Sequence, residues 1–473
     1  MGRALSRSGT RASGTDRLAD AAPSPYWSDA IPAPGRTRPA LAGDSECDVA
    51  IVGAGYTGMW TAYYLAERDP TLRISILEAE RAGFGASGRN GGWCSGLFPV
   101  AWSRVARASG TEGARALRLA LEGSIDEVGA VAAREQIDCD FAKGGTVLLA
   151  RGEAQLARAR AEVAEARELG IGGEDLRLLS RTETLARVGA TGVLGATFTP
   201  HCAALHPAKL VHGLAGALER RGVTIYERTP VRAVTPGAAR TARGTVRAHT
   251  IVIATEGYGT SLRPRQVMPV YSLMLATEPL GEEIWEQIGL AARETFADHR
   301  HLIVYGQRSA DGRICFGGRG APYHLGSAVR PAFDQNRRVH ASLVRSLVEL
   351  FPALASVAIT HRWGGALAIA RDWHPSVGLD PTTRIAWAGG YAGDGVAATN
   401  LAGRTLAELI SGEDGPLGRL PWVGHRSPPW EPEPLRWLGV NALLSCVAGA
   451  DRSEARHQRP ARRMAAISRL LGD

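Results

Sequence analysis

The stretch that decides the fold runs from Cys47 to Trp93 and reads CDVAIVGAGYTGMWTAYYLAERDPTLRISILEAERAGFGASGRNGGW. Within it, DVAIV is a short apolar strand rich in β-branched residues, YTGMWTAYYLAER has the length and spacing of a helix, and RISILE is a second strand. This order predicts a strand–helix–strand unit, with glycines at the turn from the first strand into the helix.

The glycines of that turn have the spacing of a dinucleotide-binding site. Gly53 permits the tight turn, Gly55 lets a pyrophosphate approach the backbone, and Gly58 permits close packing of the helix. Glu78 closes the second strand, where a carboxylate can accept hydrogen bonds from ribose hydroxyls. The pattern therefore predicts dinucleotide binding, with a purely structural glycine turn as the alternative.

A second glycine-rich loop, AGFGASGRNGGW, follows Glu78 and spans residues 82–93. A minimal NAD-binding unit does not need such a loop, but an extended flavin dinucleotide could use it along its ribityl chain. The loop therefore favours FAD over NAD as the dinucleotide.

Two later segments carry a family resemblance when they are taken together with the glycine loops. They are RWGGALAIARDWHPSVG at 362–378 and AGGYAGDGV at 388–396. The combination resembles the FAD-dependent D-amino-acid oxidase family, and within it bacterial oxidoreductases of the γ-glutamylputrescine oxidase type. The resemblance covers most of the chain from about Ser24 onward.

The resemblance implies an α/β fold, with a Rossmann-like FAD-binding domain built from discontinuous segments and an α+β substrate domain with an antiparallel sheet. Three strand-like segments, VYSLMLATEPL, HLIVYGQ and RICFGG, independently indicate such a sheet. The expected FAD-binding domain comprises 45–98, 196–262 and 362–413, and the expected substrate domain comprises 99–195 and 263–361.

The two ends of the chain are expected to lie outside these domains. Residues 1–44 are rich in Ala, Arg, Gly, Ser and Pro, which predicts a disordered or extended tail that drapes over the surface. Residues 414–473 look like a C-terminal appendix, in which WLGVNALLSCVAGA at 437–450 is expected to form a core helix.

The resemblance also assigns residues to the parts of FAD. The ADP half is expected against Gly53, Gly55, Tyr56, Thr57, Gly58 and Glu78, with Val231 beside the adenine. The diphosphate and flavin are expected against Ser87, Gly88, Arg89, Asn90 and Gly91, and the ribityl chain and flavin ring against Gly390, Tyr391, Gly393, Asp394, Gly395 and Val396.

Four side chains are candidates for contact with the substrate: Tyr305, Arg319, Trp363 and Asp394. Arg319 could clamp a substrate carboxylate or form a structural ion pair. Trp363 could form a wall of an amine pocket or pack in the core. Asp394 could attract a cationic substrate or cap the following helix.

The expected reaction is the FAD-dependent oxidation of a C–N bond in an amine or amino acid. Hydride transfer to the flavin gives an imine, water hydrolyses the imine, and oxygen reoxidises the flavin with formation of hydrogen peroxide. The alternatives are a dehydrogenase with a different electron acceptor and, from another class, a flavin-bearing nucleic-acid-modifying protein.

Composition narrows the partners that we expect. The net charge is +8, yet no basic run interleaved with aromatic residues is present, which argues against nucleic-acid binding. The six cysteines lie far apart without a C-x-x-C pair, which argues against a bound metal or a disulfide framework. This cysteine pattern is typical of a protein in the reducing cytoplasm. No apolar run reaches the roughly 18 residues of a membrane-spanning helix. We therefore expect a small amine or amino-acid substrate and oxygen as partners.

Overall fold

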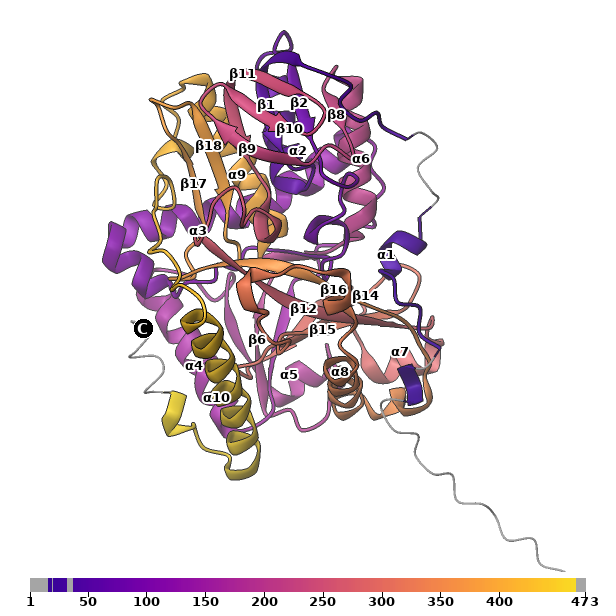
Figure 1. Ribbon diagram of the computed structural model, residues 1–473. Helices are drawn as coiled ribbons and strands as arrows, with labels where there is room; N and C mark the ends of the chain where they lie inside the picture. Colours follow the sequence, from indigo (N-terminus) through magenta and orange to yellow (C-terminus); the bar gives the residue numbers. More distant parts are fainter. Residues whose placement is uncertain (1–15, 19, 32–36, 465–473) are drawn as a thin grey trace, which may run out of the picture.

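The computed structural model describes residues 16–18, 20–31 and 37–464. Two large sheets dominate these residues, one mostly parallel and one mostly antiparallel, and they occupy the upper and lower halves of Figure 1. Helices cover both sheets, and this combination confirms the predicted fold class.

The first sheet has eight strands, six of which follow the order β17-β18-β11-β1-β2-β8. Their bounds are β17 (Ser376–Leu379), β18 (Ile385–Gly389), β11 (Thr245–Ile253), β1 (Ser45–Val52), β2 (Ile74–Leu77) and β8 (Thr224–Tyr226), with β9 (Val231–Thr235) and β10 (Ala238–Thr241) extending from β11. The central strand β1 runs parallel to both β11 and β2. It is the first strand of the predicted strand–helix–strand unit.

Three helices pack against this sheet: α2 (Tyr56–Arg68), α6 (Pro207–Arg220) and α9 (Gly395–Ser411). Helix α3 (Trp102–Arg134) packs on α9. Helix α2 is buried along nearly its whole length, and it packs between α9 and α6. The apolar residues of β1, α2 and α9 share one large core cluster. The glycine turn at the start of α2 is thus fixed on both sides.

The second sheet also has eight strands, in the order β16-β12-β15-β14-β13-β4-β6-β5. Their bounds are β16 (Ile359–Ala370), β12 (Val267–Thr277), β15 (Ile314–Gly318), β14 (Val304–Arg308), β13 (Thr295–Asp298), β4 (Thr146–Ala150), β6 (Gly195–Thr199) and β5 (Arg177–Ser180). All neighbours are antiparallel except β13 and β4. A small third sheet pairs β3 (Trp93–Ser95) with β7 (Cys202–Ala204).

The remaining helices lie around the second sheet and at the ends of the described chain. They are α1 (Tyr26–Asp29), α4 (Glu153–Glu168), α5 (Arg181–Leu185), α7 (Glu282–Ile288), α8 (Arg337–Leu350) and α10 (Leu435–His457). Short 3-10 turns are η1 (Asp16–Leu18), η2 (Ala86–Gly88), η3 (Glu256–Tyr258), η4 (Leu325–Ser327), η5 (Pro331–Gln335), η6 (Pro352–Ser356) and η7 (Leu417–Arg419). Among the described residues, no helix combines the length and apolar character needed to cross a membrane.

Two strands belong to a different sheet from the one that the expected domain bounds imply. Strands β6 and β16 were expected mostly within the FAD-binding segments, but both pair in the antiparallel sheet. The reason is that β16 is one long strand that pairs with β12 along its length before the chain turns back toward β17. The division of the chain into domains otherwise stays a prediction.

The N-terminal expectation is wrong for the residues of 1–44 that the structure describes, while residues 1–15, 19 and 32–36 lie outside the described part. Leu18 and Trp27 are each 1% exposed and Leu41 is 2% exposed, so these side chains belong to the core. Composition misleads here because a few large apolar residues, spaced along a polar segment, are enough to dock it.

The expectation of a core helix at 437–450 is also wrong. Helix α10 buries only Arg436, Ala450 and Glu454, while Leu435 and Leu438 are 60% and 54% exposed. In Figure 1 it runs along the outside of the molecule. The apolar residues of this segment therefore do not lie on the side of α10 that packs against the rest of the protein.

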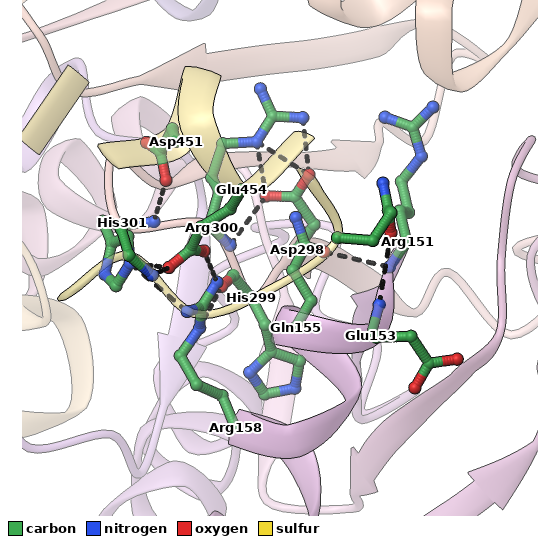
Figure 2. A network of polar contacts seen from close by, with 12 residues as sticks. Arg151, Glu153, Gln155, Arg158, Asp298, His299, Arg300, His301, Asp451 and Glu454 are labelled. Carbon is green, nitrogen blue, oxygen red and sulfur yellow. Dashed lines mark hydrogen bonds and ion pairs between the residues drawn. The ribbon is translucent and has the colours of Figure 1, made fainter. Parts of the chain in front are cut away.

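Polar contacts hold α10 instead (Figure 2). Asp451 accepts hydrogen bonds from the backbone N–H groups of His301 and Leu302, at 2.8 and 2.9 Å. Glu454 pairs with Arg158 at 2.8 Å and contacts the His301 ring at 3.1 Å. Two carboxylates one helical turn apart thus attach the helix to α4 and to the loop after β13.

We expect Gly58→Ala to destabilise the protein. A Cβ at this position would lie 2.1 Å from the Gly53 carbonyl oxygen and 3.1 Å from Ile51, so α2 would have to move away from β1. Overpacking of this kind costs about 1–3 kcal/mol, which a thermal denaturation curve would detect.

Gly123→Ala is the matched control, because Gly123 is exposed within α3 and a Cβ there meets no atom within 4 Å. Alanine should raise stability at this position by about 0.5–1 kcal/mol through helix propensity. A Gly58→Ala protein as stable as the control would contradict the close packing.

Candidate functional site

One cavity lies along the carboxyl ends of the parallel strands and reaches the second sheet. Its volume is about 930 Å³. The glycine turn and Glu78 line it, and so do Arg89 from the second glycine loop and Tyr391 before α9. Segments far apart in sequence therefore enclose one elongated cavity, as expected for an extended dinucleotide.

The glycine turn is shaped by contacts that a side chain would prevent. Gly53 has φ of +109°, and a Cβ there would lie 2.5 Å from the Ala254 carbonyl oxygen. Gly55 precedes the first residue of α2 and lines the cavity. The start of α2 is therefore exposed to the cavity, where its partial positive charge favours an anionic group such as a diphosphate.

Glu78 holds the end of the turn through its carboxylate. One oxygen accepts the Ala54 N–H at 2.8 Å, and the other accepts the Glu80 N–H at 2.9 Å. Burial raises the pKa of Glu78 above its ordinary value. The side chain is thus oriented at the cavity wall where a ribose is expected.

Ser87 links the second glycine loop to the first. Its Oγ accepts the N–H of Tyr56 at 2.8 Å, so η2 is fixed to the first residue of α2. Asn90 closes the loop, because its amide donates to the carbonyls of Ala86 and Ser87 and its oxygen accepts the Gly92 N–H. The two glycine loops therefore form one connected wall.

Most of the residues expected to contact FAD do line this cavity. They are Gly53, Gly55, Tyr56, Thr57, Glu78, Ser87, Arg89, Asn90, Val231, Tyr391, Gly393, Gly395 and Val396. Four expected glycines lie behind the wall: Gly58, Gly88, Gly91 and Gly390. The first three pack too closely against neighbours for a Cβ, at 2.1 Å from Gly53, 2.3 Å from Gly83 and 2.6 Å from Tyr305.

Tyr305 and Trp363, two of the substrate candidates, stand on the antiparallel sheet. The Tyr305 hydroxyl lies 2.9 Å from the Ser272 Oγ, and burial raises the pKa of this phenol. Trp363 is 1% exposed and donates its indole N–H to the Arg89 carbonyl at 2.8 Å. Neither lines the 930 Å³ cavity, and both support the second glycine loop from outside.

Arg319 and Asp394 both lie beside Gly393, which lines the cavity. Arg319 donates to the Ala392 carbonyl at 2.6 Å and lies over the Trp373 ring at 5.5 Å. Asp394 precedes α9 without a capping hydrogen bond from its side chain. Burial raises the pKa of Asp394, and the positive charge of Arg319 opposes that shift. Neither side chain lines the cavity, although Gly393 and Gly395 do.

Sequence reasoning missed Glu256, which lies in η3 after β11. Its carboxylate accepts the N–H groups of Gly390 and Tyr391, at 2.9 and 3.2 Å, and it lines the cavity. Burial raises the pKa of Glu256 to about 7. A signal was present, because β11 is parallel to β1 and residues after both strands reach the same edge of the sheet.

Asp334 was also missed, and no local pattern marks it. It forms an ion pair with Arg89 at 2.9 Å, and both residues line the cavity. Burial raises the pKa of Asp334 to about 6, although Arg89 opposes the shift. This ion pair joins the second glycine loop to η5.

The residues present fit FAD on the geometry of the cavity itself. Only a backbone without a Cβ leaves space at Gly55, because a Cβ there would lie 2.9 Å from the Ser87 Oγ. The start of α2, Glu78 and Val231 all line this cavity. A helix start suits a diphosphate, and a carboxylate after the second strand suits a ribose, so these residues fit the ADP half of FAD.

Comparisons with known proteins agree with this reading. A family model described as FAD dependent oxidoreductase matches residues 48–409. The chain is 32% identical over 375 residues to gamma-glutamylputrescine oxidoreductase of Escherichia coli, covering 78% of this chain and 84% of the relative. It is 33% identical over 394 residues to probable oxidoreductase OrdL of Rhizobium meliloti, covering 81% and 87%. These matches confirm the family resemblance expected from the sequence.

Solved structures show the same fold. Glycine oxidase from Geobacillus kaustophilus matches with a TM-score of 0.66 at 20% identity, covering 80% of this chain and 99% of that one. L-Proline dehydrogenase from P. horikoshii matches with a TM-score of 0.65 at 18% identity, covering 80% and 96%. At these identities the likeness concerns the fold alone.

The raised pKa of Glu256 predicts a pH dependence of stability for the apoprotein. The folded state keeps the proton up to about pH 7, whereas the ordinary pKa is 4.5. The stability from this group is therefore complete below pH 4.5 and is lost as the pH rises through about 7. Relative to Glu256→Gln, the unchanged protein should lose roughly 1–3 kcal/mol across this window, measured by urea unfolding.

Glu282→Gln serves as the control, because Glu282 is exposed at the start of α7. Its difference from the unchanged protein should stay constant across the same pH range. A constant difference for Glu256→Gln as well would contradict the assigned pKa.

Proposed function

Because the chain belongs to the family of FAD-dependent oxidoreductases, we propose that it oxidises a C–N bond of an amine or amino acid and that oxygen is the final electron acceptor. The observation that carries the proposal is the 930 Å³ cavity, which runs from the glycine turn to the Gly393 loop. Arg319 and Asp394 stand beside that loop. The name of one relative, gamma-glutamylputrescine oxidoreductase, supports a C–N bond as the target.

The proposed reaction requires neither a metal nor a nucleophilic side chain. FAD, when bound, supplies the acceptor for the hydride of the C–H bond next to the nitrogen. The substrate loses that hydride and one proton and becomes an imine, which water hydrolyses to a carbonyl compound and an amine or ammonia. Oxygen takes up the two electrons and two protons and becomes hydrogen peroxide. The protein's task is then to orient the amine and to exclude water.

We assign Arg319 and Asp394, which stand beside the Gly393 loop that lines the cavity, to substrate recognition. A guanidinium such as Arg319 binds a carboxylate through two parallel hydrogen bonds, and a buried carboxylate such as Asp394 attracts an ammonium group. Tyr305 and Trp363, on the antiparallel sheet, would support the second glycine loop and so keep it correctly placed relative to the substrate. In this scheme the parallel sheet holds FAD, and the antiparallel sheet covers the reacting end.

The choice of oxygen separates this proposal from a dehydrogenase that uses another acceptor. A dehydrogenase would reduce its bound FAD with the same substrates but would release little peroxide in air. The two activities therefore differ in one measurable product.

The compartment that we infer for this protein is the cytoplasm, since the six cysteines form no disulfide.

The decisive experiment uses the FAD-loaded protein and a panel of polyamines, N-acylated diamines, N-methyl amines and amino acids. Anaerobic addition of a true substrate should bleach the flavin absorbance, and air should restore it with one peroxide per turnover. Bleaching without peroxide in air would assign the protein to the dehydrogenases. No bleaching by any amine or amino acid would overturn the proposed substrate class.

Asp394→Asn tests the role of the carboxylate in recognition. The variant should retain its FAD, because the Asp394 side chain makes no capping hydrogen bond. Its KM for a cationic amine should rise about tenfold, which corresponds to about 1.4 kcal/mol of lost interaction when chemistry is slow relative to dissociation.

Asp414→Asn removes the same charge at a control position, where the side chain is 86% exposed and pairs with Arg419 at the surface. Its KM should equal that of the unchanged protein. If both variants retain the original KM, Asp394 does not read the charge of the substrate.

A further inference from the structure

An N-terminal segment outside the family match reaches the second glycine loop. Helix α1 carries Trp27, which is 1% exposed and donates its indole N–H to the Asn90 carbonyl at 2.8 Å. The family match begins at residue 48, so it does not include this contact. A residue far upstream of β1 therefore bonds directly to a loop that lines the cofactor cavity.

A second tryptophan holds the preceding carbonyl of the same loop. Trp363, on β16, donates its indole N–H to the Arg89 carbonyl at 2.8 Å. The rings of Trp27 and Trp363 lie edge to face with centroids 6.4 Å apart. Two consecutive carbonyls, those of Arg89 and Asn90, are thus fixed by two indole donors that pack against each other.

The segment that carries Trp27 is itself anchored to the antiparallel sheet. The Ala22 N–H donates to the Thr360 carbonyl at 2.8 Å, and the Ala22 carbonyl accepts the Arg362 N–H at 2.9 Å. Trp27 therefore links the antiparallel sheet to the second glycine loop, which follows the parallel sheet.

The same N-terminal segment contributes to the cavity wall. Pro23, Ser24 and Pro25 line the 930 Å³ cavity together with Arg89 and Asn90. The Gln335 amide donates to the Pro23 carbonyl at 3.2 Å, which holds this part of the segment against η5. The segment is therefore a wall of the cavity as well as a support for the loop.

We propose that Trp27 is a positioning residue for FAD, which fixes the Asn90 carbonyl and so holds the second glycine loop in place, where Ser87, Arg89 and Asn90 line the cavity. Loss of the indole N–H would leave the Asn90 carbonyl unpaired and allow the peptide to rotate. The cofactor would then bind more weakly and in an altered environment. The proposal concerns FAD binding alone, so it does not depend on which amine is oxidised.

The test measures FAD affinity and the visible spectrum of the bound flavin in Trp27→Phe. Phenylalanine keeps an aromatic ring beside His206 and Trp363 but lacks the N–H donor. We expect the dissociation constant of FAD to rise about tenfold and the flavin absorption bands to shift, while the apoprotein melts within a few degrees of the unchanged protein.

Tyr26→Phe is the matched control in the same segment. It removes the hydrogen bond to Asp311 and leaves both indole bonds to the loop intact. FAD affinity and spectrum should stay unchanged. Equal weakening in both variants would mean that the segment acts only through general stability, and this result would overturn the proposal.

A second replacement covers the case in which Trp27→Phe does not fold. Substituting 3-benzothienylalanine at position 27 exchanges the indole N–H for sulfur and keeps the size of the ring system. Weaker FAD binding and a shifted spectrum support the proposal. Unchanged affinity and an unchanged spectrum in either variant contradict it.

Discussion

The close approach of two glycines is the constraint on which the site depends. Gly58 lies so near the Gly53 carbonyl that a Cβ would come within 2.1 Å of it, and this contact brings α2 onto β1. Only then can Ser87 accept the Tyr56 N–H and attach the second glycine loop to the helix start. The wall of the cavity is therefore built outward from one backbone contact. Burial of β1 and α2 in a common core supplies the force that maintains it.

The second glycine loop is where the two sheets become one site. Arg89 pairs with Asp334, Gly91 packs against the Tyr305 ring, and Trp363 donates to the Arg89 carbonyl. Each of these contacts joins a loop that follows the parallel sheet to the antiparallel sheet or to the segments next to it. Movement between the sheets would therefore change the loop directly. The N-terminal segment adds to this connection through Trp27, from a part of the chain that the family match does not cover.

The sequence predicts the features that depend on local spacing. The glycine turn and Glu78 lie within one strand–helix–strand unit, so their separation along the chain fixes their separation in space. The sequence does not reveal Glu256, because its role depends on which strands pair. It does not reveal Asp334, because the role of that residue depends on an ion pair with Arg89 of the second glycine loop. The misreading of 437–450 has a similar cause. The apolar run predicts a core helix, whereas two carboxylates on α10 decide which of its sides is attached.

Two opposite charges, those of Asp394 and Arg319, lie near the start of α9. Asp394 stands before the first turn of the helix, where the helix dipole favours an anion, and Arg319 favours its ionised form as well. Burial opposes both effects and raises the pKa of this carboxyl. A bound ammonium group would add a second favourable charge and restore the ionised form. A carboxylate on the same substrate would be attracted to Arg319 in turn. If Arg319 and Asp394 recognise the substrate as proposed, the two side chains together would suit a substrate that carries both an ammonium and a carboxylate better than one with a single charge.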